Sequence, residues 1–167
     1  MSILPIRVWP HSDLRVVADP VTDFGPVLQQ LVSDMAETMY TNKGVGLAAT
    51  QVGIPLRILV MDCASEDQDS RFFVLINHVV SSFSSDLLVR HEGCLSFPGV
   101  WEEVARPSWV EGYAVDASGT RFNFRYEGLE AQCVQHEGEH LEGKVLVDHL
   151  SRTKRRFVEK TLRNRRG

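Results

Sequence analysis

Residues 136–140 read His-Glu-Gly-Glu-His, and they lie inside a segment, 128–142, whose residues predict a helix that Gly143 would end. Two histidines four positions apart on a helix are separated by about 40° around the axis and by one turn along it. Both imidazoles can therefore reach one cation, with the first glutamate of the pattern beside it. The alternative is a pair of solvated histidines on an acidic helix face. The helical context favours a metal site.

The glycine within this pattern points the same way. Gly138 stands in the middle of the expected helix, where glycine costs about 0.5–1 kcal/mol relative to alanine. A glycine kept at such a cost indicates that another group approaches the helix backbone closely.

A catalytic metal site needs a third protein ligand and an open position for water. The candidates are Cys94, Cys133, His149 and several acids. Cys133 lies one helical turn before the first histidine, but a thiol at such a position is more often part of the core. Cys94 belongs to a tight turn, Glu-Gly-Cys-Leu-Ser at 92–96, where a side chain and neighbouring backbone amides can project together. We therefore favour Cys94, and a set of two histidines and one cysteine suits zinc, iron(II) or a related divalent ion.

A third segment, 44–51, is rich in glycine and reads Gly-Val-Gly-Leu-Ala-Ala-Thr-Gln. It lacks the lysine of a phosphate-binding loop and the strand–helix context of a dinucleotide fingerprint. Alone, it predicts only a flexible turn against a sheet. Its last residue, Gln51, is an uncharged donor of the kind found in oxyanion holes.

The remaining segments predict one α+β domain. Apolar residues at three- and four-residue spacing predict an amphipathic helix over 24–40. Short β-branched or aromatic runs predict mostly antiparallel strands at 57–63, 71–77, 87–90, 108–115 and 121–126. We expect these strands to wrap around the central metal-binding helix, with residues 1–150 forming the catalytic part. An arginine-rich C-terminal helix over 151–167 would belong to the same domain.

Length and composition agree with a soluble globular protein. The 167 residues are 43% hydrophobic and 24% charged, which excludes disordered and fibrous classes. No apolar run reaches membrane-spanning length, and the first ten residues do not resemble a signal peptide. Three cysteines make no complete pairing, so a reducing compartment is expected and at least one thiol is free. Together these features predict a cytoplasmic protein.

Charge is distributed unevenly along the chain. Residues 151–167 hold eight Lys or Arg and one acid, so they carry +7, which leaves −11 for residues 1–150 of a chain with net charge −4. The basic end can be a solvated, self-repelling helix end, or it can bind a polyanionic surface.

The three segments Gly44–Gln51, Glu92–Ser96 and Gln135–Gly143 resemble, in order and character, the three motifs of peptide deformylases. The resemblance extends to Leu14-Arg15, to Asp19-Pro20-Val21 and to Arg106-Pro107, so it covers nearly the whole chain. It implies an enzyme that removes the formyl group from the N-terminal formylmethionine of nascent polypeptides. It also makes docking of the basic helix to ribosomal RNA a sensible expectation, and we expect a monomer.

The resemblance also implies roles for individual residues. One divalent metal ion, usually iron(II) in the family with zinc, nickel or cobalt accepted, would be held by Cys94, His136 and His140. Glu137 would be the general acid/base. The Gln51 amide and the backbone N–H of Leu95 would stabilise the oxyanion. The residues expected to bind substrate are Gly46, Val45, Arg90, Leu129 and Gln132.

Three positions depart from the family pattern. Glu139 stands where the family usually has aspartate, and its longer carboxylate could still bind Arg106. Arg90 and Gln132 are polar where family members commonly have apolar residues around the methionine pocket. As a hypothesis, this enzyme tolerates a more polar first side chain.

Two other functions fit the same pattern. A zinc-dependent aminopeptidase-like peptidase also uses His-Glu-x-x-His, but such enzymes usually take the third ligand from downstream, where His149 is the only histidine. A non-catalytic, metal-stabilised binding module would have a closed site with four protein ligands and no role for Glu137.

Overall fold

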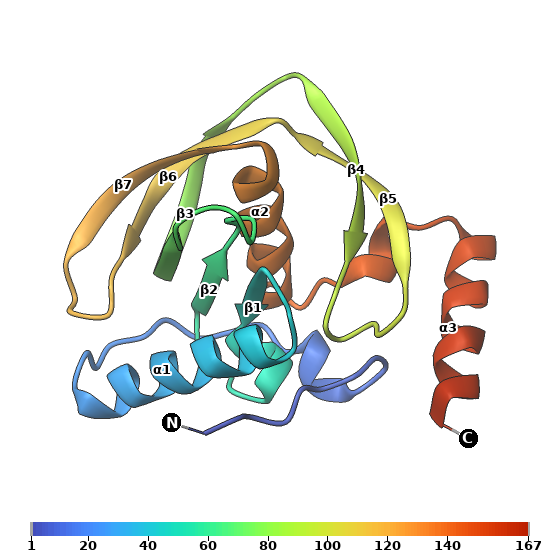
Figure 1. The fold of residues 1–167 in the computed structure, drawn as a ribbon, viewed down its shortest axis with the longest axis horizontal. Coiled ribbons are helices and arrows are strands. Elements are labelled where there is room, and N and C mark those ends of the chain that lie inside the picture. The colour runs from blue at the N-terminus through green and yellow to red at the C-terminus, as the bar shows by residue number, and fades with distance from the viewer. Residues whose placement is uncertain (1, 167) are drawn as a thin grey trace.

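Helix α2 (Gly128–Leu141) packs against two antiparallel sheets in the computed structural model, which describes residues 2–166 (Figure 1). The larger sheet has the strand order β1-β2-β3-β6-β7, and the smaller one is the hairpin β4-β5. The strands are β1 (Gly46–Ala48), β2 (Ile58–Asp62), β3 (Phe72–Phe83), β4 (Leu87–Gly93), β5 (Trp101–Pro107), β6 (Trp109–Val115) and β7 (Arg121–Glu127). The other elements are α1 (Pro26–Thr41), α3 (Arg152–Arg166) and the short helices η1 (Ser12–Arg15), η2 (Ala49–Val52) and η3 (Leu146–His149). The predicted α+β class, with strands around a central helix and a C-terminal helix, is confirmed.

Strand β2 is buried on both faces because a helix covers each of them. Its five residues are all buried. Leu59 and Met61 share a hydrophobic cluster with α2, whereas Ile58 and Val60 share another with α1. This alternation follows from the two-residue period of a strand. The sheet therefore holds α1 and α2 on opposite faces.

Helix α1 forms where the sequence predicted it. Pro26 begins the helix, where the missing N–H costs nothing. Leu28, Val32, Met35 and Met39 are buried on the face that meets the sheet, which is the apolar stripe of an amphipathic helix. None of the helices within residues 2–166 is both long and apolar enough to cross a membrane.

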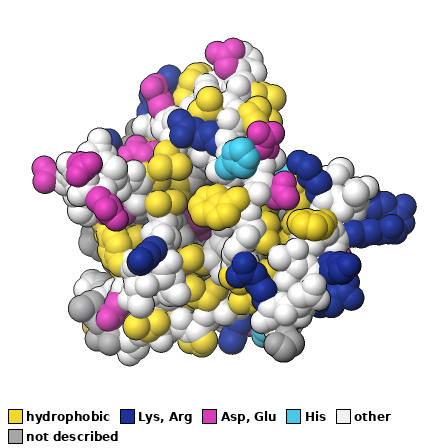
Figure 2. Space-filling model, turned by 45° about the vertical axis from the view of Figure 1, so that its right-hand side comes forward, with side chains coloured by type: hydrophobic (Ala, Val, Ile, Leu, Met, Phe, Trp, Pro, Cys, Tyr) yellow, Lys and Arg dark blue, Asp and Glu magenta, His cyan; other side chains and the backbone are white. Residues whose placement is uncertain are grey.

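The C-terminal helix α3 is anchored by two apolar side chains. Val158 and Leu162 are 1% and 3% exposed, and they pack in a cluster with Trp9 and Phe97. The other face of α3 is basic, and Lys and Arg side chains gather at the side of the molecule where this helix lies (Figure 2).

Two strands were not predicted from the sequence. β5 carries two adjacent glutamates, Glu102 and Glu103, which hid its alternating pattern, and its pairing with β4 over seven residue pairs stabilises it. β1 is only three residues long, inside the glycine-rich segment. β3 also continues to Phe83, beyond the predicted end, through two register irregularities in its pairing with β6.

The close approach expected at the helix glycine is made by a histidine from β3. A Cβ added at Gly138 would lie 2.7 Å from Nε2 of His78. The His78 side chain is 7% exposed, and burial, with a smaller effect of the Arg57 charge, lowers its pKa to about 4. A neutral imidazole thus packs against the back of α2, where only a glycine leaves enough room.

Gly138→Ala should therefore destabilise the protein although alanine is the better helix former. The helix propensity gain is about 1 kcal/mol, but overpacking against a buried ring typically costs about 1–3 kcal/mol. Chemical denaturation would measure the change. In a His78→Ala background the same substitution should be neutral or stabilising, and equal destabilisation in both backgrounds would contradict the prediction.

Acidification should weaken the fold through His78. Its pKa of about 4 in the folded protein lies below the ordinary histidine value of 6.5, so the stability linked to the neutral ring is complete above pH 6.5 and is lost as the pH falls toward 4. Between pH 7 and pH 4 the free energy of unfolding should fall by about 3 kcal/mol more in the parent than in His78→Leu. If the free energy of unfolding fell equally in the two proteins between pH 7 and pH 4, the role of His78 would be ruled out.

Candidate active site

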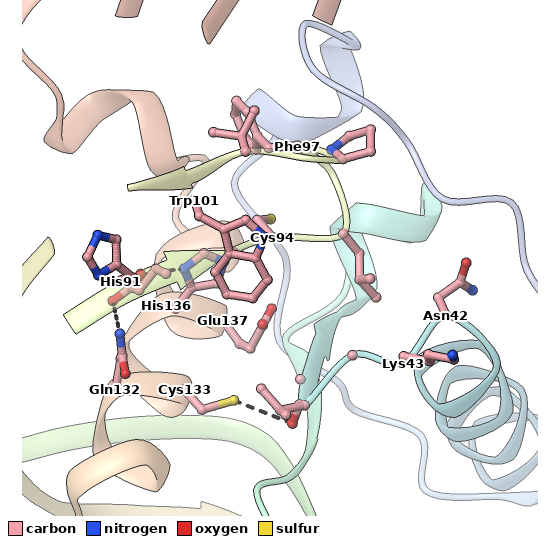
Figure 3. Close-up of a pocket in the computed structure, with 18 of the residues that line it drawn as sticks. Asn42, Lys43, His91, Cys94, Phe97, Trp101, Gln132, Cys133, His136 and Glu137 are labelled. Carbon is pink, nitrogen blue, oxygen red and sulfur yellow. Dashed lines mark hydrogen bonds and ion pairs between the residues drawn. The ribbon is translucent and has the colours of Figure 1, made fainter. Parts of the chain in front are cut away.

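A cavity of about 440 Å³ opens in front of α2 (Figure 3). Its walls come from three parts of the chain: the segment around β1, the turn between β4 and β5, and α2 itself. These are the places of the three motifs that the sequence singled out. The fold therefore brings together segments that lie far apart along the chain.

Cys94, His136 and His140 place their ligand atoms within 4.8 Å of one another. Sγ of Cys94 lies 3.3 Å from Nε2 of His140. Nε2 of His136 is buried without a hydrogen-bond partner in the described structure, and such an atom is costly unless something binds it. A metal ion would satisfy it, and the sulfur and nitrogen donors suit zinc or iron(II). The residues present fit a divalent metal.

The other two candidates for a third ligand have different partners. Sγ of Cys133 lies 3.6 Å from the backbone oxygen of Val45. Nε2 of His149 lies 2.7 Å from Oε2 of Glu139. Neither belongs to the group of three.

The orientation of His136 is set by Glu92 from the end of β4. Nδ1 of His136 lies 2.9 Å from Oε1 of Glu92. Because a carboxylate only accepts, the proton is on Nδ1 and the lone pair of Nε2 faces the cavity side. Burial opposes ionisation of Glu92, but hydrogen bonds from Arg106 and His136 lower its pKa to about 2. Glu92 is therefore an anion that fixes the ring and its tautomer.

Arg106 from β5 compensates the Glu92 charge. Its Nε and Nη2 donate to the two oxygens of Glu92 at 2.5 and 2.9 Å. Nη1 donates to Oε1 of Glu139 at 2.8 Å. The contact between Glu139 and Arg106 that was suggested from the sequence is present. The longer glutamate also reaches His149, which the sequence did not indicate.

Glu137 lies at the wall of the cavity, one residue after the first histidine. The residue is 5% exposed, and Oε2 of its carboxyl group has no partner among the described residues. Burial raises the pKa of Glu137 to about 7. A carboxyl group with this pKa can both accept and release a proton near neutral pH.

Gln51 lies in η2, behind Cys94. Its Oε1 accepts from the backbone N–H of Ala48 at 2.9 Å, which turns the amide nitrogen the other way. Nε2 then lies 3.5 Å from Sγ of Cys94 and 3.1 Å from Oγ of Ser96. The amide donor is thus held beside the group of three ligand atoms. Leu95, the next expected oxyanion residue, follows Cys94 and lines the cavity.

Four of the five expected substrate-binding residues line the cavity: Val45, Gly46, Leu129 and Gln132. Gly46 has no room for a side chain, since a Cβ would lie 2.6 Å from Sγ of Cys133 and 2.8 Å from Oε1 of Glu137. Arg90 is exposed and is not among the lining residues. Its guanidinium instead lies near Gly128, at the start of α2.

Two further residues were not identified from the sequence. Trp101 lines the cavity, is 68% exposed, and packs so closely on Gly93 that a Cβ there would lie 2.8 Å from its ring. Glu92 was quoted within its motif, but its bond to His136 was not foreseen. A carboxylate just before the cysteine turn was the available signal.

Matches to known proteins cover most of the chain. Residues 3–156 match the family model described as polypeptide deformylase. The sequence is 45% identical over 162 residues to the peptide deformylase of Cellvibrio japonicus, covering 97% of this chain and 95% of that protein. It is 44% identical to the peptide deformylase of Pseudomonas aeruginosa, with the same coverage.

Solved structures agree with these matches. A peptide deformylase from Legionella pneumophila has a TM-score of 0.93 and 39% identity, covering 99% of this chain and 96% of that chain. A peptide deformylase from Ehrlichia chaffeensis, in complex with actinonin, has a TM-score of 0.94 and 34% identity, and the match covers 99% of this chain and 98% of that chain. Because residues 3–156, most of the chain, match the family model, this chain belongs to the polypeptide deformylase family, whose members are hydrolases.

Proposed function

We propose that this chain removes the N-formyl group from the N-terminal formylmethionine of nascent polypeptides by metal-dependent hydrolysis. The observation that carries the proposal is the convergence of Cys94, His136 and His140 beside Glu137, whose Oε2 has no partner among the described residues. Two of the proposed ligands, Cys94 and His136, and the proton carrier Glu137 line one cavity, as hydrolysis of an amide requires.

Cys94, His136 and His140 would hold the metal ion. When bound there, a divalent cation supplies Lewis-acid chemistry, which lowers the pKa of water and polarises the formyl oxygen. We propose iron(II) as the native metal, with zinc, nickel or cobalt as substitutes. The orphaned Nε2 of His136 supports the ligand assignment.

The remaining steps belong to the chain's own residues. Gly46 and Val45 bind the peptide main chain at the cavity wall, where Leu129 and Gln132 also lie. Glu137 accepts a proton from the attacking water and delivers it to the departing amine nitrogen. The Gln51 amide and the Leu95 N–H donate to the charge that develops on the formyl oxygen. One such donor typically contributes about 2.7–4 kcal/mol to transition-state stabilisation.

The geometry favours this function over both alternatives. In the peptidase alternative the third ligand comes from downstream, yet His149 is bound to Glu139 and the third donor is the upstream Cys94. A closed structural site needs four protein ligands. Within residues 2–166 the group holds three, which leaves a position for water.

The location and partners follow from this reaction. Nascent chains emerge from ribosomes in the cytoplasm, so we propose that the protein works there as a monomer. The basic face of α3 would contact ribosomal RNA. Its exposed cations include Arg152, Arg156, Lys160 and Arg163.

Formate release tests the function directly. Under anaerobic conditions, the iron(II)-loaded protein should release formate from formyl-Met-Ala peptides and should leave unblocked peptides uncut. Glu137→Ala should keep the metal but lose about 10²–10⁴-fold in turnover, because proton transfer is lost. Cys94→Ala should lose the metal, whereas the matched variant Cys133→Ala should retain it. Cleavage of unblocked peptides without formate would establish the peptidase instead. Full metal occupancy in Cys94→Ala with loss in Cys133→Ala would overturn the ligand assignment.

The basic helix can be tested without unfolding it. Truncation after His149 would expose the cluster that Val158 and Leu162 fill, so charge removal is the better change. A triple variant, Arg152→Ala, Arg156→Ala and Lys160→Ala, should associate more weakly with ribosomes. The slope of log K against log salt concentration should become shallower by about 0.7–0.9 for each phosphate contact that is lost. Formate release from short peptides should be unchanged. Ribosome binding equal to that of the parent would discard the RNA contact.

A further inference from the structure

Gln132 is a cavity residue whose polar end is turned toward another side chain (Figure 3). It lies on α2, one turn before His136, and is 7% exposed. Its amide nitrogen donates to Oε2 of Glu92 at 2.9 Å. The polar group is therefore bound to the carboxylate that orients His136.

The hydrogen bonds of Glu92 are complete only when Gln132 is counted. Oε1 accepts from Nδ1 of His136 and from Nη2 of Arg106, both at 2.9 Å. Oε2 accepts from Nε of Arg106 at 2.5 Å and from Gln132. A carboxylate offers about four acceptor positions. Gln132, which itself lines the cavity, fills the fourth.

Loss of this donor would leave a buried acceptor unsatisfied. Such a group costs about 1–3 kcal/mol, and Glu92 can relieve the cost by rotating or by admitting water from the cavity. Rotation also displaces Oε1, because the two oxygens move as one planar group, and an admitted water does not hold the carboxylate in place as the Gln132 amide does. The hydrogen bond that fixes the His136 ring would then weaken.

We propose that Gln132 is a positioning residue for His136. It holds the Glu92 carboxylate in the orientation that keeps Nε2 of His136 aimed toward Cys94 and His140. The inference rests on the proposed function only for its activity measurement, because metal retention can be measured without any substrate.

The competing interpretation is that Gln132 selects the first side chain of the peptide. One N–H of its amide nitrogen is already bound to Glu92, so the amide is held in place and only its second N–H and Oε1 remain for a substrate. Arg90, the second polar residue of that hypothesis, lies outside the cavity lining. The structure therefore favours positioning over selection of polar side chains.

The test compares Gln132→Leu with Gln135→Leu. Gln135 lies three residues further on the same helix, and its amide donates to the backbone oxygens of Pro107 and Ala131. The dissociation rate of Zn(II) is measured with a chromophoric chelator. Values of kcat and KM are then compared for formyl-peptides that begin with methionine, norleucine or serine.

Gln132→Leu should release Zn(II) about three- to tenfold faster than the parent, somewhat less than the 10–100-fold expected for a direct partner of a ligand. Its kcat should fall while the preference among the three peptides is kept. Gln132→Asn, whose shortened amide cannot reach Glu92, should show the same faster Zn(II) release and lower kcat. It provides a second test if the leucine variant does not fold. Gln135→Leu should leave the Zn(II) dissociation rate unchanged.

Two results would overturn the inference. One is a Zn(II) dissociation rate that Gln132→Leu and Gln132→Asn do not change. The other is equal acceleration in the Gln135→Leu control, which would indicate general loosening of the helix. A changed ratio between methionine and serine peptides with unchanged Zn(II) release would assign Gln132 to substrate selection. Failure of the proposed function would appear separately, as absence of formate release by the parent protein.

Discussion

The buried ion pair between Glu92 and Arg106 is the interaction on which the site depends. Both side chains are about 5% exposed or less, and burying two charges costs several kcal/mol for each unless they are paired and hydrogen-bonded. Here Arg106 binds two carboxylates, Glu92 and Glu139, and Glu92 binds His136. Removal of one partner would leave a buried charge uncompensated, at a cost of about 3–5 kcal/mol. Through Glu92, His136 is thus linked to the charges of the β4-β5 hairpin.

The hairpin β4-β5 makes this pair possible. Its register places Leu88 opposite Arg106 and Glu92 opposite Glu102, so Glu92 and Arg106 lie four positions apart along the paired strands. Residues separated by an even number of positions project from the same face of a strand. Both side chains can therefore meet α2 from one side. The turn after Gly93 then brings Cys94 to the two histidines.

Local patterns were readable from the sequence, and distant pairings were not. The spacing of His136 and His140 fixes their common helix face, so the pair could be predicted from periodicity alone. Gly138 correctly indicated a close approach, but the identity of His78, sixty positions away, could not follow from it. The direction of the Gln132 amide depends on a carboxylate forty residues earlier. The exposed position of Arg90 depends likewise on how β4 lies over the start of α2. Strand β5 was not predicted because its inward-facing positions carry the charged Glu102 and Arg106, which interrupt the apolar alternation.

Helix α2 is polar enough that the hydrophobic effect alone would not fix its position. Its buried residues include Gln132, His136, Glu137 and His140, and buried polar groups stabilise a structure only when they are satisfied. On the cavity side, Glu92 satisfies part of this set. On the opposite side, Gly138 lets the neutral ring of His78 pack against the helix backbone. A charged ring there would lie near the Arg57 guanidinium, which further lowers the His78 pKa. The helix is thus fixed by polar contacts in front and by close packing behind, so His136 and His140 cannot move independently of the sheet.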